Sequence, residues 1–269
     1  MGGYTPAPSP ERGLVVLIHG WEGGMDSAYI LSAGAHLHRQ GYGVFRLNLR
    51  DHGGTHHLNE GIFYATLIEE THQALKLAAA LAGPNPAYLA GFSLGGNFAL
   101  RLGLLCRDDP IPNLSKILAV SPVLDPAKAT RAIDAHPLFR WYFVKKWKQS
   151  LARKMAVHPH RYDFRRVLAL DSVGAITNAL IRDLGEFASA QDYFDRYNIT
   201  CDRLAGLTLS TAIVAAADDP IIPAEDFRDL RLGPSTRLHL HRHGGHSGFI
   251  QSWSFDAWHE RFMTQFFVG

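Results

Sequence analysis

The sequence predicts an α/β fold, in which a mostly parallel β-sheet is flanked by helices and carries a helical insertion. Short apolar runs rich in valine and isoleucine are typical of strands that are buried on both faces. These runs alternate with helical stretches, as crossovers between parallel strands require. One long stretch, residues 125–206, has helical patterning and no clear strand.

The expected strands are continuous apolar runs that end in glycine-rich or polar loops. The clearest is the run at residues 14–18, which precedes a glycine-rich loop at residues 19–24. Further strands are predicted at residues 42–49, 87–91, 117–120, 209–216 and 237–241. The proline-rich residues 1–12 are expected to form an irregular lead-in.

The expected helices lie between these strands and repeat their apolar residues every three to four positions. The first stops at Gly41 and the second at Gly83, because glycine often follows the end of a helix. The helices are predicted at residues 28–39, 64–82, 94–106, 224–230 and 254–266.

The stretch without strands is too long for an ordinary crossover. We therefore expect a core formed by residues 1–125 and 207–269, with a helical cap segment, residues 126–206, inserted over one edge of the sheet. Part of this segment, residues 137–155, repeats apolar residues every four positions and carries lysines beside them. The apolar residues are Phe139, Phe143, Trp147, Leu151 and Met155, and the lysines are Lys145, Lys146, Lys148 and Lys154. This pattern predicts an amphipathic helix that packs on the core with a solvated basic face; transient contact with a membrane surface is a second interpretation.

The composition indicates one globular unit with a large core. Of the 269 residues, 46% are hydrophobic and 19% are charged, and the formal net charge of +2 gives no reason to expect nucleic acid as a partner. Cys106 and Cys201 are too few for a disulfide framework, so we expect two small buried residues in a reducing compartment. Neither a signal peptide nor an apolar run of membrane-spanning length is recognisable, which predicts a cytoplasmic protein.

The strongest functional motif is GFSLGG, at residues 91–96, between a predicted strand and a predicted helix. Gly91 and Gly95 lack the side chains that would clash in a sharp turn at this point. The turn presents the hydroxyl of Ser93 at the carboxyl end of the strand, where the amino end of the next helix favours negative charge. Ser93 is therefore the candidate nucleophile. A plain glycine turn and a phosphate-binding loop are the alternatives, but the glycine patterns of nucleotide-binding loops are missing from the sequence.

A serine hydroxyl needs a base to accept its proton. The best candidate is His246, in a glycine-rich loop that follows the last predicted strand. An acid is then required to orient the histidine and stabilise its cation. Asp218 and Asp219, directly after the strand at 209–216, compete for this role, and Asp125 is a third alternative.

Acyl transfer places negative charge on a carbonyl oxygen, which prearranged N–H groups stabilise. One donor is expected to be the backbone N–H of Leu94, the residue after the nucleophile. The other is expected to be the N–H of Trp21, in the loop at residues 19–24. The alternative is that this loop is only a tight connection between a strand and a helix.

Two groups of histidines raise the question of a metal site; they are His239, His241 and His243 in one group and His52, His56 and His57 in the other. The first group alternates along a strand, but no carboxylate or cysteine is spaced to complete a site. We interpret it as a solvated strand edge. The second group is expected in a polar loop near the mouth of the cleft. We therefore expect neither a metal nor a cofactor.

With these motifs in place, the chain resembles the α/β-hydrolase superfamily from about residue 14 to its end. More narrowly, it is similar to the YheT-like group of hydrolases. The residues that carry the resemblance are HGWEG at 19–23 with DSAY at 26–29, NLRDHGG at 48–54, GFSLGGN at 91–97, FAS at 187–189 with DYF at 192–194, ADDP at 217–220 and GGHSGF at 244–249. In this superfamily the nucleophile, acid and base follow in the order Ser, Asp, His, and in many members the acid stands four residues before a proline. The resemblance therefore favours Asp219, four residues before Pro223, over Asp218.

The resemblance implies that the chain hydrolyses carboxylic esters, with Ser93, Asp219 and His246 at the triad positions. An apolar cap over them favours small-molecule esters with hydrophobic acyl groups. Two other interpretations stay open: a catalytically silent binding protein on the same scaffold, and an amidase or peptidase that uses the same triad. The oligomeric state and the leaving group are left open.

The chain departs from its relatives before residue 14. Relatives carry further strands there, so the sheet is expected either to lack its first two strands or to belong to a truncated chain. In the first case the strand around Val44–Leu47 is an edge or is covered by other residues.

Overall fold

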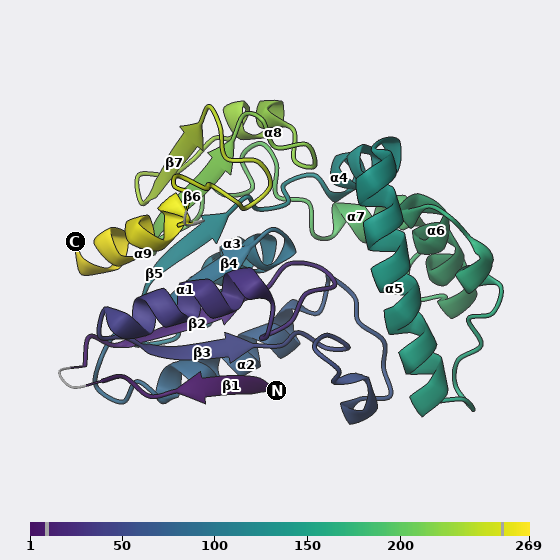
Figure 1. Ribbon diagram of the computed structural model, residues 1–269, viewed down its shortest axis with the longest axis horizontal. Helices are drawn as coiled ribbons and strands as arrows, with labels where there is room; N and C mark the ends of the chain where they lie inside the picture. The colour runs from purple at the N-terminus through teal and green to yellow at the C-terminus, as the bar shows by residue number, and fades with distance from the viewer. Residues whose placement is uncertain (9–10, 254–255) are drawn as a thin grey trace.

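A seven-stranded β-sheet forms the centre of the computed structural model, which describes residues 1–8, 11–253 and 256–269 (Figure 1). Its strands are β1 (Gly2–Thr5), β2 (Leu14–Ile18), β3 (Gly43–Leu47), β4 (Ala87–Phe92), β5 (Leu114–Val120), β6 (Ser210–Ala216) and β7 (Thr236–His241). Their order across the sheet is β1-β3-β2-β4-β5-β6-β7, and every neighbouring pair is parallel except β1 and β3. The predicted mostly parallel sheet is confirmed.

The central strands are apolar on both faces because helices cover both sides of the sheet. Every residue of β2 and β4 is buried, as is every residue of β6 after Ser210. Along β2, Val15 and Leu17 join one apolar cluster, whereas Val16 and Ile18 join another. This alternation of the side chains divides the core of the molecule into two layers.

The helices of the core lie on these two layers (Figure 1). Residues from α1 and α9 share one cluster, and residues from α2 and α3 share the other. These helices are α1 (Ala28–Arg39), α2 (Ile68–Ala80), α3 (Leu94–Leu105) and α9 (Trp258–Val268); the short α8 (Ala224–Arg228) follows β6. The predicted start of the last helix, Ser254, lies outside the described residues. The second helix begins at Ile68 rather than at the predicted residue 64, because residues 64–67 form a turn closed by the Leu67 N–H.

The prediction of an irregular lead-in was wrong for Gly2–Thr5. These residues form β1, which runs antiparallel to β3 and pairs Gly2 with Leu47 and Thr5 with Val44. A four-residue strand with two glycines carries almost no apolar pattern, and it forms because β3 offers it unpaired backbone groups. In the described residues, one short strand therefore precedes β2 and covers the edge at β3.

The chain between β5 and β6 contains helices and no strand; all of its residues are described. These helices are α4 (Pro126–Ala135), α5 (Pro137–Val157), the short η2 (Val167–Ala169), α6 (Val173–Leu184) and α7 (Ala190–Asp195), and they gather at one end of the molecule (Figure 1). The apolar side chains of α4, α5, η2 and α6 form one cluster with residues of β5 and β6, such as Ala119 and Ile213, whereas Tyr193 and Phe194 of α7 pack against the cluster of α2 and α3. Asp125 caps the amino end of α4, because its side chain accepts a hydrogen bond from the N–H of Lys128 at 2.9 Å.

The long helix α5 confirms one part of the amphipathic pattern and contradicts another. Its predicted apolar row packs on the cluster of the cap segment, with Leu151 fully buried. Lys154, however, is 1% exposed rather than solvated. Its Nζ lies 2.9 Å from Asp51 Oδ1 and also donates to the carbonyl oxygens of Asn59 and Gly61. The prediction was wrong because the partners of Lys154 lie about a hundred residues away in the sequence, and a local sequence pattern cannot indicate them.

Two smaller predictions concern cysteines and membrane spans. Cys106 is buried as predicted, but Cys201 is exposed, because it occupies a surface turn with a positive φ of 59°. Within the described residues, no helix combines the length and the apolar character needed to cross a membrane.

Candidate active site

Ser93 occupies a strained turn between β4 and α3. Its φ of 53° and ψ of −116° match the geometry predicted from the glycines around it. A Cβ on Gly91 would lie 2.1 Å from the carbonyl oxygen of Gly95, and a Cβ on Gly95 would lie 2.3 Å from that of Ile18. Only glycine therefore fits at these two positions, and the turn leaves Ser93 facing a cavity at the carboxyl end of the sheet.

The structure brings together the three side chains that the sequence singled out. Nε2 of His246 lies 2.9 Å from Oγ of Ser93, and Nδ1 of His246 lies 2.9 Å from Oδ2 of Asp219. Ser93 follows β4, Asp219 follows β6 and His246 follows β7. The carboxyl ends of these strands meet at one edge of the sheet. The chain of contacts from acid to imidazole to hydroxyl is the arrangement that activates a serine.

Asp219 is held where it can orient an imidazole. Its side chain is 1% exposed, and Oδ1 accepts hydrogen bonds from the N–H groups of Ile221 and Ile222 at 2.8 and 3.0 Å. A buried carboxylate needs such partners, because leaving it without hydrogen bonds costs several kcal/mol. Oδ2 remains directed at His246.

Asp218 has a different role from its neighbour. Its Oδ1 accepts hydrogen bonds from the N–H groups of Gly244 and Gly245, at 2.9 and 2.8 Å. The hydrogen bond from Gly245 is the main reason that the pKa of Asp218 is lowered. Asp218 therefore anchors the loop that carries His246, whereas Asp219 contacts the imidazole. Asp125, the third alternative, caps α4 instead.

Of the two predicted oxyanion donors, Leu94 directly follows Ser93 and Trp21 lies on the loop after β2. Leu94 is the first residue of α3, and Trp21 follows Gly20, whose added Cβ would come within 3.2 Å of the Cβ of Ser93. Across the three described ranges, neither the N–H of Trp21 nor that of Leu94 has a hydrogen-bond acceptor in the protein. Two free N–H groups beside a nucleophile, at the amino end of a helix, suit a developing negative charge.

His19 and Tyr29 hold the loop of Trp21, and no role for either residue was predicted from the sequence. The N–H of Leu49 donates to Nε2 of His19 at 3.2 Å, so Nδ1 carries the proton and donates to the carbonyl oxygen of Gly20 at 2.8 Å. Burial lowers the pKa of His19 to about 4, which keeps the ring neutral. The hydroxyl of Tyr29 accepts a hydrogen bond from the N–H of Gly20 at 2.8 Å. Both residues lie next to this loop in the sequence, but that position alone does not indicate these contacts.

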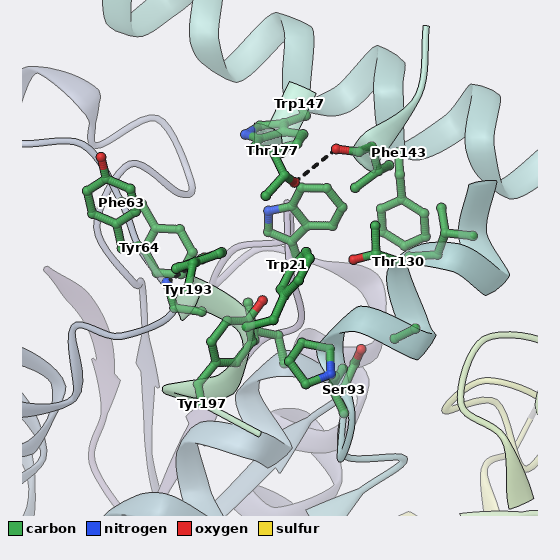
Figure 2. Close-up of a pocket in the computed structure, with 18 of the residues that line it drawn as sticks. Trp21, Phe63, Tyr64, Ser93, Thr130, Phe143, Trp147, Thr177, Tyr193 and Tyr197 are labelled. Atoms are coloured by element: carbon green, nitrogen blue, oxygen red, sulfur yellow. Dashed lines mark hydrogen bonds between the residues drawn. The ribbon is translucent and has the colours of Figure 1, made fainter. Parts of the chain in front are cut away.

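A cavity that is partly open to solvent lies above Ser93 and below the cap segment. Figure 2 shows Trp21 at its centre, with Phe143 and Trp147 of α5 beyond it. The ring of Trp21 stacks on that of Phe143 at 5.4 Å and meets that of Trp147 edge-on at 4.9 Å. No charged side chain is among the described residues that line this cavity.

The cavity has two kinds of wall. One wall is aromatic, and its residues are Phe63, Tyr64, Tyr193, Phe194 and Tyr197. Another wall is mostly aliphatic and comes from α4 and α6; its residues are Ala129, Thr130, Ile133, Val173, Thr177, Leu180 and Ile181. Both walls favour an apolar ligand over a charged one.

The prediction of a polar loop at the cleft mouth was wrong for His52 and His56. They are 3% and 4% exposed, whereas His57 is exposed. Burial lowers the pKa of His52 to about 3 and that of His56 to about 4. Nε2 of His56 hydrogen-bonds Oγ of Ser150 on α5 at 2.8 Å, so α5 covers this loop.

His52 and His56 line a second, polar cavity between the core loops and α5. Lys146, Gln149, Ser150 and Arg153 supply its wall on α5. Glu22, beside Trp21, faces this cavity, and burial raises its pKa to about 8. Trp21 and Glu22 therefore point to different cavities from the same loop.

The histidines of the last strand pack on aromatic rings. His239 meets Phe262 at 4.7 Å, and His241 meets Trp258 at 4.2 Å. His243 is exposed, with its side chain 75% accessible. In the part of the chain that the structure describes, no cluster of three metal-ligating side chains is present.

Comparisons with known proteins identify the family of the chain. Residues 15–260 match the sequence profile of the family described as the alpha/beta hydrolase family. The chain is 25% identical over 271 residues to a candidate esterase of Synechocystis, slr0264, and 23% identical over 254 residues to a candidate esterase of Escherichia coli, YheT. Each alignment covers 91% of this chain and 73% of the relative. The resemblance to the YheT-like group is confirmed.

A solved structure shows the same fold. The monoacylglycerol lipase of Paleococcus ferrophilus superposes with a TM-score of 0.59 and 19% identity. The superposition covers 100% of this chain and 98% of the lipase. At this level of identity the likeness speaks for the fold alone.

Proposed function

Because the chain belongs to the alpha/beta hydrolase family, we propose that it is a serine hydrolase that cleaves carboxylic esters of hydrophobic acyl groups. The observation that carries this proposal is the distance of 2.9 Å between His246 Nε2 and Ser93 Oγ, at the floor of an apolar cavity. The esterases among its relatives support a hydrolase activity, and the choice of nucleophile and ester is our inference.

In the proposed reaction, Oγ of Ser93 attacks the ester carbonyl while Nε2 of His246 takes the hydroxyl proton. Asp219 keeps the imidazole oriented and stabilises its positive charge. The N–H groups of Trp21 and Leu94 stabilise the oxyanion that forms. The intermediate collapses to an acyl-Ser93 ester, and the alcohol leaves with the proton from His246.

The second half of the reaction uses the same groups with water in place of the alcohol. His246 accepts a proton from water, and the resulting hydroxide attacks the acyl carbon. The bond to Ser93 Oγ then breaks, and Oγ takes the proton back from His246. No cofactor or metal is needed at any of these steps.

The substrate class follows from the cavity. Its aromatic and aliphatic walls offer no counter-ion, so a charged acyl group would lose its hydration without compensation. An apolar acyl chain loses nothing comparable and gains about 25 cal/mol for each Å² of its surface that is buried. We propose that residues 126–206 act as a cap that forms the upper wall of this cavity on the core of residues 1–125 and 207–269.

A fluorophosphonate probe tests the nucleophile. We expect it to label the native protein and to fail on Ser93→Ala, with Ser121→Ala as the matched control because Ser121 is a buried serine near His246 that contacts Ser247. Labelling that persists in Ser93→Ala contradicts the assignment. A native protein that is never labelled favours a silent binding protein on the same scaffold.

A panel of p-nitrophenyl esters with acyl chains of two to twelve carbons tests the substrate class. We expect kcat/KM to rise with chain length until the cavity is filled, because each added methylene contributes about 0.8 kcal/mol on burial. A matched p-nitroanilide series separates an esterase from an amidase. Turnover of the anilides at rates equal to the esters would contradict the ester assignment.

A further inference from the structure

The outer face of the first half of α5 combines exposed aromatic side chains with lysines. Leu138 is 62% exposed, Trp141 is 59% exposed and Tyr142 is 45% exposed. Nζ of Lys145 lies 4.9 Å from the ring centre of Trp141, and Nζ of Lys146 lies 6.0 Å from that of Tyr142. Exposing rings of this size to water is costly, so such a patch usually has a partner.

The helix α5 also differs from the rest of the chain in its charge. The helix contains six lysines and arginines and no aspartate or glutamate. Since the whole chain has a formal net charge of +2, the other residues carry a formal net charge of −4. Lys154 is buried against Asp51 and Arg153 lines the second cavity, whereas Lys145 and Lys146 lie over the rings of Trp141 and Tyr142.

We propose that this patch docks on an anionic lipid surface. Tryptophan and tyrosine are the side chains that favour the boundary between headgroups and acyl chains, and lysine and arginine pair with anionic headgroups. A second copy of this chain fits less well, because a two-fold contact would place two basic helices against each other. Nucleic acid is opposed by the acidic balance of the rest of the chain.

The patch is continuous with the wall of the apolar cavity. The ring of Tyr142 meets that of Phe143 at 5.3 Å, and Phe143 lines the cavity above Ser93. One turn further along the same helix, Trp147 also lines it. A lipid surface bound to the outer face of α5 would therefore lie next to the cavity that we propose for hydrophobic acyl groups.

Binding to vesicles tests this proposal directly. We expect the native protein to cosediment with vesicles of phosphatidylcholine that contain 30% phosphatidylglycerol, and to bind pure phosphatidylcholine vesicles at least tenfold more weakly. Trp141→Ser should weaken binding to the anionic vesicles by about tenfold. Lys145→Ala should weaken it by about fivefold at low salt, since each cation near an anionic surface contributes about 1 kcal/mol.

The matched controls are exposed apolar residues on other elements. Leu77→Ser on α2, where Leu77 is 76% exposed, and Trp253→Ser, where Trp253 is fully exposed, should bind as the native protein does. Ser93→Ala should also bind normally, so failure of the proposed chemistry would not affect this assay. Equal binding by native protein and Trp141→Ser would overturn the proposal. A native dimer that Trp141→Ser converts to monomer would overturn it in favour of self-association.

Discussion

The carboxyl edge of the sheet and the cap segment above it are held in place by different interactions. At the edge, backbone groups fix the side chains: glycines permit the strained turn at Ser93, and two N–H groups hold Asp219. The cap segment is held in place by side chains instead, through an apolar cluster and the buried ion pair of Lys154 and Asp51. We therefore expect substitutions at the edge to change the chemistry with little effect on stability, and substitutions in the cap segment to do the reverse.

The largest effect is expected at the edge, from Ser93→Ala and His246→Ala. Each should reduce kcat for a p-nitrophenyl ester by about 10⁴-fold or more, because the nucleophile and its base act as a unit. The double variant should be little worse than either single variant. Unfolding in urea should stay close to that of the native protein. Near-normal turnover in either variant would contradict the assignment of Ser93 as nucleophile and His246 as base.

The two adjacent aspartates at the edge of the sheet should differ in their effect on catalysis. Asp219→Asn should lower kcat by about 10³- to 10⁴-fold, because an amide cannot hold the imidazole in the required tautomer or stabilise its cation. Asp218→Asn should lower it far less, since Asp218 contacts the backbone of Gly244 and Gly245 rather than His246. Steady-state kinetics on both variants check this difference. A larger loss for Asp218→Asn would reverse our assignment of the two carboxylates.

The same division explains which features could be predicted from the sequence. The turn at Ser93 depends on glycines two residues before and after it, so a short motif contains the whole requirement. The order of motifs along the chain then places His246 and an aspartate at the same edge, because parallel strands end together. The choice between Asp218 and Asp219 needed the resemblance, since both follow the same strand.

The wrong predictions concern residues whose burial or pairing depends on parts of the chain that are distant in the sequence. Lys154 looks like a solvated lysine in an amphipathic helix, and only its contact with Asp51 shows otherwise. His52 and His56 look like loop residues, but α5 covers them. β1 forms because β3 has an open edge, which is a property of the sheet rather than of residues 2–5.

A substitution of Lys154 tests how much the stability of the protein depends on the buried ion pair that holds the cap segment. Lys154→Met should lower the free energy of unfolding by about 3 kcal/mol, because it leaves the carboxylate of Asp51 buried without its ion pair. Lys145→Met, an exposed lysine on the same helix, should change it by less than about 0.5 kcal/mol. Urea denaturation measures both. Equal stability of the two variants would show that α5 does not depend on the buried pair.

Glu22 lies where the two regions meet, beside Trp21 and beneath α5. Burial raises its pKa from the ordinary value of 4.5 to about 8, although Lys146 opposes this change. The folded state therefore keeps a proton between pH 4.5 and 8 that the unfolded chain releases. Since the folded state binds more protons in this window, the free energy of unfolding must fall as the pH rises, by at most about 1.4 kcal/mol per pH unit.

Glu22→Gln should remove this fall, because a glutamine cannot release a proton. Urea denaturation at pH 5, 6.5 and 8 should show a flatter dependence for Glu22→Gln than for the native protein, with the greatest relative gain in stability at pH 8. Glu69→Gln, an exposed glutamate on α2, should leave the dependence unchanged. If Glu22→Gln followed the native curve, the carboxyl group of Glu22 would have to reach solvent. The contact between the loop of Trp21 and α5 would then be looser than the second cavity implies, and the edge of the sheet would be less shielded by the cap segment.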